Sequence, residues 1–100
     1  MSAAAVSAEV PELVRAVLHH YPTILTCLRQ FIPEPVVTRT WRRNPGGDRV
    51  TLTIACAPAE GERVVDALVA RLRYLGFYAD VAGDGSAVCV RLSGYYGTRV

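Results

Sequence analysis

Clusters of proline, glycine and other turn-forming residues divide this chain into segments too short for anything but a small mixed fold. A helix cannot continue through Pro33-Glu34-Pro35, and the stretch NPGGD, from Asn44 to Asp48, is a dense turn signal. Gly76 and the glycines at 83 and 85 provide two further breaks. Between these breaks lie two segments long enough for helices and four of strand length.

The first long segment has helical periodicity. Its apolar residues recur every three or four positions from Leu13 to Ile32, and Pro11 suits the first turn of a helix. Pro22 interrupts the segment because it removes one backbone hydrogen bond. Since the apolar phase continues on both sides of Pro22, the sequence predicts one kinked helix rather than two short ones. The wide apolar stripe also contains a heptad seam, which would either cover a sheet or contact a second subunit. The seam residues are Val14, Leu18, Tyr21, Leu25, Leu28 and Ile32.

The later segments predict a hairpin, a helix and a second pair of strands. Alternating residues at 36–43 and 49–57 predict two strands joined by the NPGGD turn. A second helix is expected from about Ala59 to Leu75, with Gly76 as its left-handed C-terminal cap. Its core stripe is Val64, Val65, Leu68, Leu72 and Leu75. Two short strands, 77–82 and 86–92, follow this helix.

The predicted order of elements is α-β-β-α-β-β, which favours an α+β fold. The economical packing is a four-stranded, mainly antiparallel sheet with both helices packed on one face. The single domain is expected to span residues 9–93. Residues 1–8 are expected to form a flexible leader, and residues 94–100 an irregular C-terminal tail.

The composition fits such a domain and argues against several classes of protein. Of the 100 residues 51% are apolar and 20% are charged, which is too apolar for a disordered chain. No apolar run approaches the roughly 18 residues needed to span a bilayer. Met1 to Ser7 lacks the basic start of a signal peptide, and the three cysteines have no disulfide or zinc spacing. We therefore expect a cytoplasmic protein without membrane contact.

The basic residues point most specifically to the predicted hairpin. All eleven are arginine, as is common in GC-rich coding sequences, and the net charge of +2 is too small to indicate nucleic-acid binding by itself. Arg39, Trp41 and Arg43 share one face of the first strand, and Arg49 lies just across the turn. On an open sheet face, arginines can bind phosphates while an aromatic ring stacks on a base.

Whether this face is open depends on the register of the hairpin. If Arg43 pairs with Arg49, Trp41 lies on the side away from the core. If Arg43 pairs with Asp48, Trp41 opposes Val50 and turns inward. The first register leaves Asn44 to Asp48 in the turn, and the second leaves Asn44 to Gly47. Turns of both lengths occur in proteins, so the sequence leaves both registers open. A partly buried tryptophan, with arginine stems packed over the sheet, is the simpler alternative.

The remaining polar and aromatic residues suggest binding rather than catalysis. Tyr95 and Tyr96 form an aromatic pair near the C-terminus that would either dock on a partner or cover the protein's own core edge. His19 and His20 are neighbours and point about 100° apart on a helix, so they cannot easily share one metal ion. The carboxylates are scattered, and we recognise no catalytic triad or phosphate-binding loop. The sequence therefore predicts no enzyme, no cofactor and no metal site.

Two stretches resemble parts of known families. Arg63 to Leu92 resembles half of a peptidoglycan-binding sporulation-related repeat domain, whose second half is missing from this chain. Arg42 to Thr53 (RRNP, then DR and TLT), followed by an alanine-rich helix, is similar to tail-terminator proteins of phages from GC-rich hosts. This second resemblance covers about a third of the chain. It implies a ring-forming structural protein without an active site.

The features together favour a small non-enzymatic binding or assembly module that acts through protein–protein association, including self-association. Weak nucleic-acid binding by the arginine and tryptophan hairpin is the alternative, and a structural protein like the phage tail terminators is a third. The candidate binding residues are Arg39, Trp41, Arg43, Arg49, Tyr95 and Tyr96.

Overall fold

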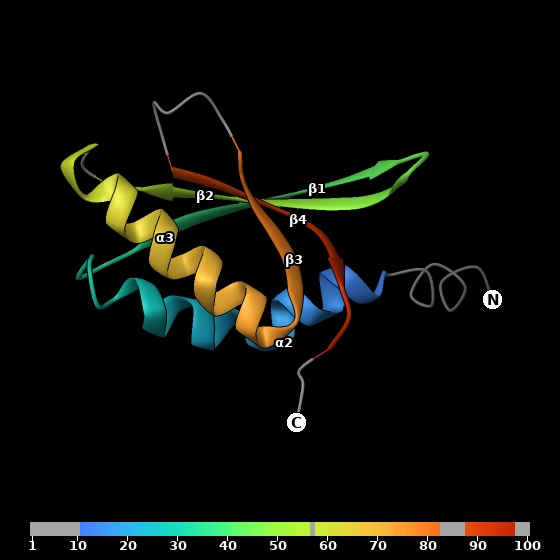
Figure 1. The fold of residues 1–100 in the computed structure, drawn as a ribbon, viewed down its shortest axis with the longest axis horizontal. Coiled ribbons are helices and arrows are strands. Elements are labelled where there is room, and N and C mark those ends of the chain that lie inside the picture. Colours follow the sequence, from blue (N-terminus) through green and yellow to red (C-terminus); the bar gives the residue numbers. More distant parts are fainter. Residues whose placement is uncertain (1–10, 57, 83–87, 98–100) are drawn as a thin grey trace.

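The computed structural model describes residues 11–56, 58–82 and 88–97, and it confirms the predicted α+β fold (Figure 1). The predicted leader at 1–8 and the loop at 83–87 lie outside the described residues. The four strands form one antiparallel sheet in the order β1-β2-β4-β3. Along the chain the elements are α2 (Glu12–Leu28), β1 (Val36–Asn44), β2 (Gly47–Ala55), α3 (Pro58–Leu75), β3 (Phe77–Ala82) and β4 (Val88–Tyr95).

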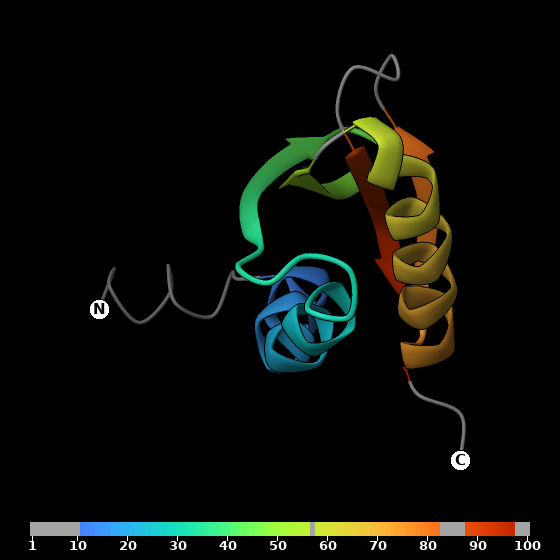
Figure 2. The ribbon, with the colours of Figure 1, turned by 90° about the vertical axis from the view of Figure 1, so that its left-hand side faces the viewer.

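The two helices lie side by side against one face of this sheet, as predicted (Figures 1 and 2). Strands β2 and β3 run parallel with β4 between them, because each is antiparallel to β4. Together with α3 they form a split β-α-β unit. The order of the described elements is that of the ferredoxin-like β-α-β-β-α-β arrangement, counted from its second helix. As a result, the first strand of each hairpin, β1 or β3, lies at an edge of the sheet.

Helix α2 is continuous through Pro22 but shorter than the sequence predicts. Pro11 precedes its first residue in an extended conformation, as suits a proline at a helix start. Within the helix, the Thr26 hydroxyl donates to the Pro22 carbonyl at 2.9 Å. The helix ends at Leu28, whose carbonyl accepts bonds from the backbone N–H groups of Phe31 and Ile32. The sequence predicts a helix that continues to Ile32 and ends at Pro33. The observed helix ends four residues before Ile32, in the turn closed by these two hydrogen bonds.

The core forms between the two helices and the inner face of the sheet. The predicted stripe of α3 is buried, except that Val65 is partly exposed, and the even-numbered residues of β2 from Val50 to Ile54 are buried as expected. Gly76 has the predicted left-handed conformation, with φ of 105°. A Cβ at this position would run into the backbone of Gly97, so glycine is required there for two reasons.

The turn of the first hairpin is shorter than predicted. Strand β1 extends to Asn44 and β2 begins at Gly47, which leaves Pro45 and Gly46 as the connection. Asparagine, then proline, and glycine in fourth place are the residues that a type I turn favours. This connection pairs Arg43 with Asp48 and Trp41 with Val50. Of the two registers that the sequence leaves open, the structure therefore has the one that turns Trp41 inward.

The predicted boundaries at the C-terminal end need correction. Strand β4 runs to Tyr95 rather than ending at Leu92, so residues 94 and 95 belong to the sheet and not to an irregular tail. After β4 the chain passes beside Gly76, the first residue after α3. There the Tyr96 backbone N–H donates to the Gly76 carbonyl at 2.8 Å. Ser93 is polar and Gly94 has a low preference for strands, so the sequence predicts that the strand ends before them.

Candidate interaction site at the edge of the sheet

Strand β1 is a long and open edge of the sheet. It pairs with β2 over nine consecutive residues without a shift in register. Among the described strands, β2 is its only neighbour. Eight of its nine residues are exposed, and Val37 is half-buried. An edge of this kind presents backbone N–H and C=O groups that a further strand can pair with.

The opposite edge, β3, is protected in two ways. It has only six residues, and its ladder with β4 is irregular between Tyr78 and Ala79. In addition, Arg73 of α3 donates from Nε and Nη2 to the Ala79 carbonyl, at 3.1 and 3.0 Å. Short length, a bulge and a covering side chain are devices by which proteins prevent edge pairing. The regular nine-residue ladder of β1 contains no bulge of this kind.

An apolar groove lies beside β1. Helix α2 packs mainly against α3, β4 and β2, so the inner side of β1 stays partly open. The groove has a volume of about 230 Å³. Its outer walls include Leu18 and Trp41, which remain 54% and 45% exposed. The full lining is Val14, Val17, Leu18, Arg39, Thr40, Trp41 and Val50. Two large apolar side chains are thus left in water next to the open edge of β1.

Polar contacts fix the side chains around this groove. The Trp41 indole donates from Nε1 to the Asp48 carboxylate at 3.1 Å, and Arg43 Nε lies 3.4 Å from the same oxygen. At the other end, the Arg39 guanidinium lies 4.5 Å from the centre of the Tyr21 ring on α2. Both arginines of the inner face are therefore engaged, by a carboxylate and by an aromatic ring.

The structure brings together some of the predicted binding residues and separates others. Arg39, Trp41 and Arg43 share one face as predicted, but this is the face toward the helices. The interpretation that places them on the open face is wrong, because the two-residue connection sets the other register. Arg49 lies on the opposite, outer face, directly across from Arg42.

Tyr95 and Tyr96 pack on the domain at the opposite edge of the sheet from the groove, next to β3. The Tyr95 hydroxyl lies 3.1 Å from His20 Nε2, and its ring centre is 4.8 Å from that of Phe77. The Tyr96 hydroxyl donates to the Arg73 carbonyl at 3.1 Å, and its ring packs at a tilt against Tyr78, with the ring centres 4.9 Å apart. Tyr95 thus closes the core, whereas Tyr96 remains 46% exposed.

His20 makes the stability of this end of the core depend on pH. Burial lowers its pKa below 6.5, and the neighbouring His19 lowers it further. The unfolded chain therefore binds a proton at His20 more readily than the folded one does. The contribution of His20 to the free energy of unfolding is complete above pH 6.5 and decreases as the pH falls below it. We expect urea unfolding midpoints to decrease between about pH 7.5 and about pH 5.5. The variant His20→Gln should show a smaller decrease, and an unchanged pH dependence would contradict this assignment.

The outer face contains an unfavourable pair of charges. Arg42 and Arg49 are direct cross-strand partners, and like charges in this position are destabilising. We expect Arg42→Glu to raise the free energy of unfolding by about 0.5 kcal/mol, because it replaces repulsion with attraction. The matched change Arg43→Glu, one residue along, should lower it by disrupting the contact with Asp48. Urea unfolding of both variants tests the register, since shifts of the same sign would contradict it.

Comparisons of the chain with protein families, curated proteins and solved structures gave no match. Within the described ranges, no group of three or more His, Cys, Asp or Glu side chains is placed to hold a metal ion. None of the helices in the described part of the chain is long and apolar enough to cross a membrane.

Sequence reasoning missed the edge as the distinctive feature of this site. The alternation of β1 and β2 predicts that they pair, but not which strand lies next to β2 on its other side. The groove was missed for the same reason, because its walls come from α2 and β1, more than twenty residues apart in the chain. The isolated Trp41, in a strand that is otherwise polar after Val37, was the available signal.

Proposed function

We propose that this chain is a small, non-enzymatic assembly module that binds a second copy of itself through the edge of β1. The observation that supports this proposal is the contrast between the two edges of the sheet. Strand β3 is short, irregular and covered by Arg73, whereas β1 is long and regular and lies beside an exposed apolar groove. Strand addition at an open edge is a common mode of protein association.

A two-fold arrangement of two copies would pair the open backbone groups of β1 and bring its side chains into favourable contacts. Two antiparallel β1 strands would join their sheets into one continuous sheet, with the same surface used by both copies. If the axis passes through Thr40, Trp41 of one copy opposes Arg39 of the other, and the reverse pair repeats the contact. Tryptophan and arginine attract each other through the ring face. The exposed Leu18 and Trp41 would also lose part of their contact with water.

The charges of β1 do not prevent this pairing. Charged side chains on an edge usually discourage association. Here Arg39 already stacks on Tyr21, and Arg43 already lies beside Asp48. In the two-fold register Arg42 would oppose Thr38 of the second copy, so no two arginines face each other directly.

The concentration dependence of the molar mass tests this function. The monomer has a mass of 10.9 kDa. We expect sedimentation experiments to show a reversible increase toward twice this mass between about 1 μM and about 1 mM, the range of weak to moderate association. A mass of 10.9 kDa throughout this range would overturn the proposal. A defined larger species would indicate a ring, as the tail-terminator resemblance implies, and would contradict the two-fold arrangement.

A further inference from the structure

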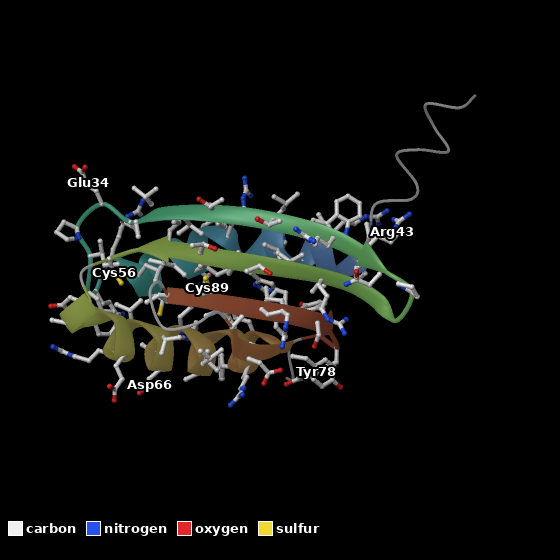
Figure 3. The ribbon with its side chains drawn as sticks, turned by 90° about the horizontal axis from the view of Figure 1, so that it is seen from above. Glu34, Arg43, Cys56, Asp66, Tyr78 and Cys89 are labelled. Carbon is white, nitrogen blue, oxygen red and sulfur yellow. The ribbon has the colours of Figure 1, made fainter. Side chains whose placement is uncertain are left out.

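The outer face of the sheet has a different character from the groove. Figure 3 looks down on this face, with the helices behind it. Residues that alternate with the buried positions of β2 and β4 point to this side, and they are mostly threonines and arginines. Apart from Tyr78, no large aromatic side chain of the four strands lies on it.

Three arginines on neighbouring strands form a cationic cluster on this face. Arg42 of β1 is directly opposite Arg49 of β2. Arg91 of β4 is opposite Thr51, which places it diagonally across from Arg49. Diagonal neighbours on one sheet face are about 7–8 Å apart, within reach of long side chains. Three guanidinium groups can therefore converge on one or two phosphate groups.

Little negative charge compensates this cluster. Asp80 is the cross-strand partner of Arg91, but its carboxylate also lies 3.6 Å from Arg73 Nη2 of α3. Within the described ranges, neither Arg42 nor Arg49 has a carboxylate within ion-pair distance. The like-charge pair of Arg42 and Arg49 is thus unfavourable for folding and is not needed to form the sheet. An anionic ligand would relieve this repulsion.

Tyr78 provides an aromatic ring on the same face as the three arginines, on the edge strand β3 next to the strand of Arg91. It remains 57% exposed. Its ring lies against β4, since a Cβ at Gly94 would be 3.0 Å from Tyr78 Cδ2. Its other neighbour is the ring of Tyr96, at 4.9 Å. In Figure 3, Tyr78 lies toward the same end of the sheet as Arg43 but at the opposite edge, and β4 separates it from Arg49 of β2. A ring held in place but still exposed can stack on a base with little loss of side-chain entropy.

From this arrangement we infer that the outer face binds single-stranded nucleic acid. The guanidinium groups of Arg42, Arg49 and Arg91 hold successive phosphates, and Tyr78 stacks on an unpaired base. A basic surface combined with an aromatic platform is the general chemistry of single-strand recognition. Stacking on Tyr78 requires a base that is not paired, which excludes a duplex as the preferred ligand. The site is independent of pairing at β1, because it uses side chains of the opposite face from Trp41.

Fluorescence anisotropy with a labelled, mixed-sequence single-stranded oligonucleotide tests this inference. We expect binding at low salt that weakens steeply toward about 200 mM salt. The double variant Arg42→Gln/Arg49→Gln should bind at least about tenfold more weakly, with a salt dependence reduced by about 1.4 in logarithmic slope. Tyr78→Ser should weaken binding several-fold, and Tyr78→Phe should retain it, because stacking needs the ring and not the hydroxyl.

A matched control separates a built site from general attraction. Arg39→Gln/Arg43→Gln removes the same charge from the same hairpin, but from its inner face. It should weaken binding by less than about twofold, as expected from the change in net charge alone. Circular dichroism and urea unfolding establish that each variant is folded.

Four results would overturn the inference. The first is an absence of binding at low salt, and the second is an equal loss in the two double variants. The third is equal affinity for a duplex of the same sequence together with no effect of Tyr78→Ser. The fourth is competition by polyglutamate as effective as that by unlabelled oligonucleotide, which would assign the face to an acidic protein instead.

Discussion

Leu68→Ala is expected to lower the free energy of unfolding by about 2–5 kcal/mol. Leu68 lies in the middle of α3 and is fully buried where the helix packs against β3, β4 and α2. Truncation removes buried methyl groups and leaves a cavity that a tightly packed core cannot fill. Since domains of this size are stable by only about 5–15 kcal/mol, the variant should unfold at a much lower urea concentration.

The matched control for this change is Leu18→Ala on α2. Leu18 is 54% exposed at the groove, so the same truncation should change stability by no more than about 0.5 kcal/mol. Urea unfolding followed by circular dichroism measures both variants, with a common slope expected for the two. Equal costs would show that the core does not lie where the structure has it.

Much of this fold follows from local patterns in the sequence. The helical period of Val64, Leu68 and Leu72 identifies the buried face of α3, and Gly76 marks its end. The alternation in β2 likewise identifies its core face. These elements were predictable because each pattern arises within one element, from the geometry of a single helix or strand.

The interaction site was less predictable because it depends on relations between elements. A difference of one residue in the hairpin connection moves Trp41 from one face of the sheet to the other. Both faces are chemically acceptable for arginine and threonine, so the residues of β1 do not select the register by themselves. The two-residue connection of Pro45 and Gly46, which pairs Arg43 with Asp48, sets it instead.

The C-terminal tyrosines illustrate the same limit. In the sequence, Tyr95 and Tyr96 form one aromatic pair with a choice between a partner and the core. In the structure, Tyr95 packs on Phe77 and bonds to His20, whereas Tyr96 packs against the exposed Tyr78. Because His20 comes from α2, seventy-five residues earlier in the chain, no local pattern could have shown this contact.

Trp41→Ser is expected to weaken self-association at least about tenfold, which corresponds to about 1.4 kcal/mol. The substitution removes the largest side chain at the edge of β1 and its proposed contact with Arg39 of the second copy. Its cost in folding stability should be only about 1 kcal/mol, because the indole is 45% exposed before association. A loss of about 3 kcal/mol or more would instead make Trp41 a core residue.

Tyr96→Ser is the matched control, because Tyr96 is 46% exposed but supports β3 at the opposite edge of the sheet. Sedimentation of both variants over the same concentrations separates the two edges. The proposal requires Trp41→Ser to stay monomeric where the unchanged chain and Tyr96→Ser associate. Amide hydrogen exchange adds a readout of the backbone itself, since pairing at β1 must slow exchange along Val36–Asn44 as the concentration rises. If the amides of β3 were protected instead, the protein would associate through the edge that Arg73 covers, and the argument from the unequal edges would fail.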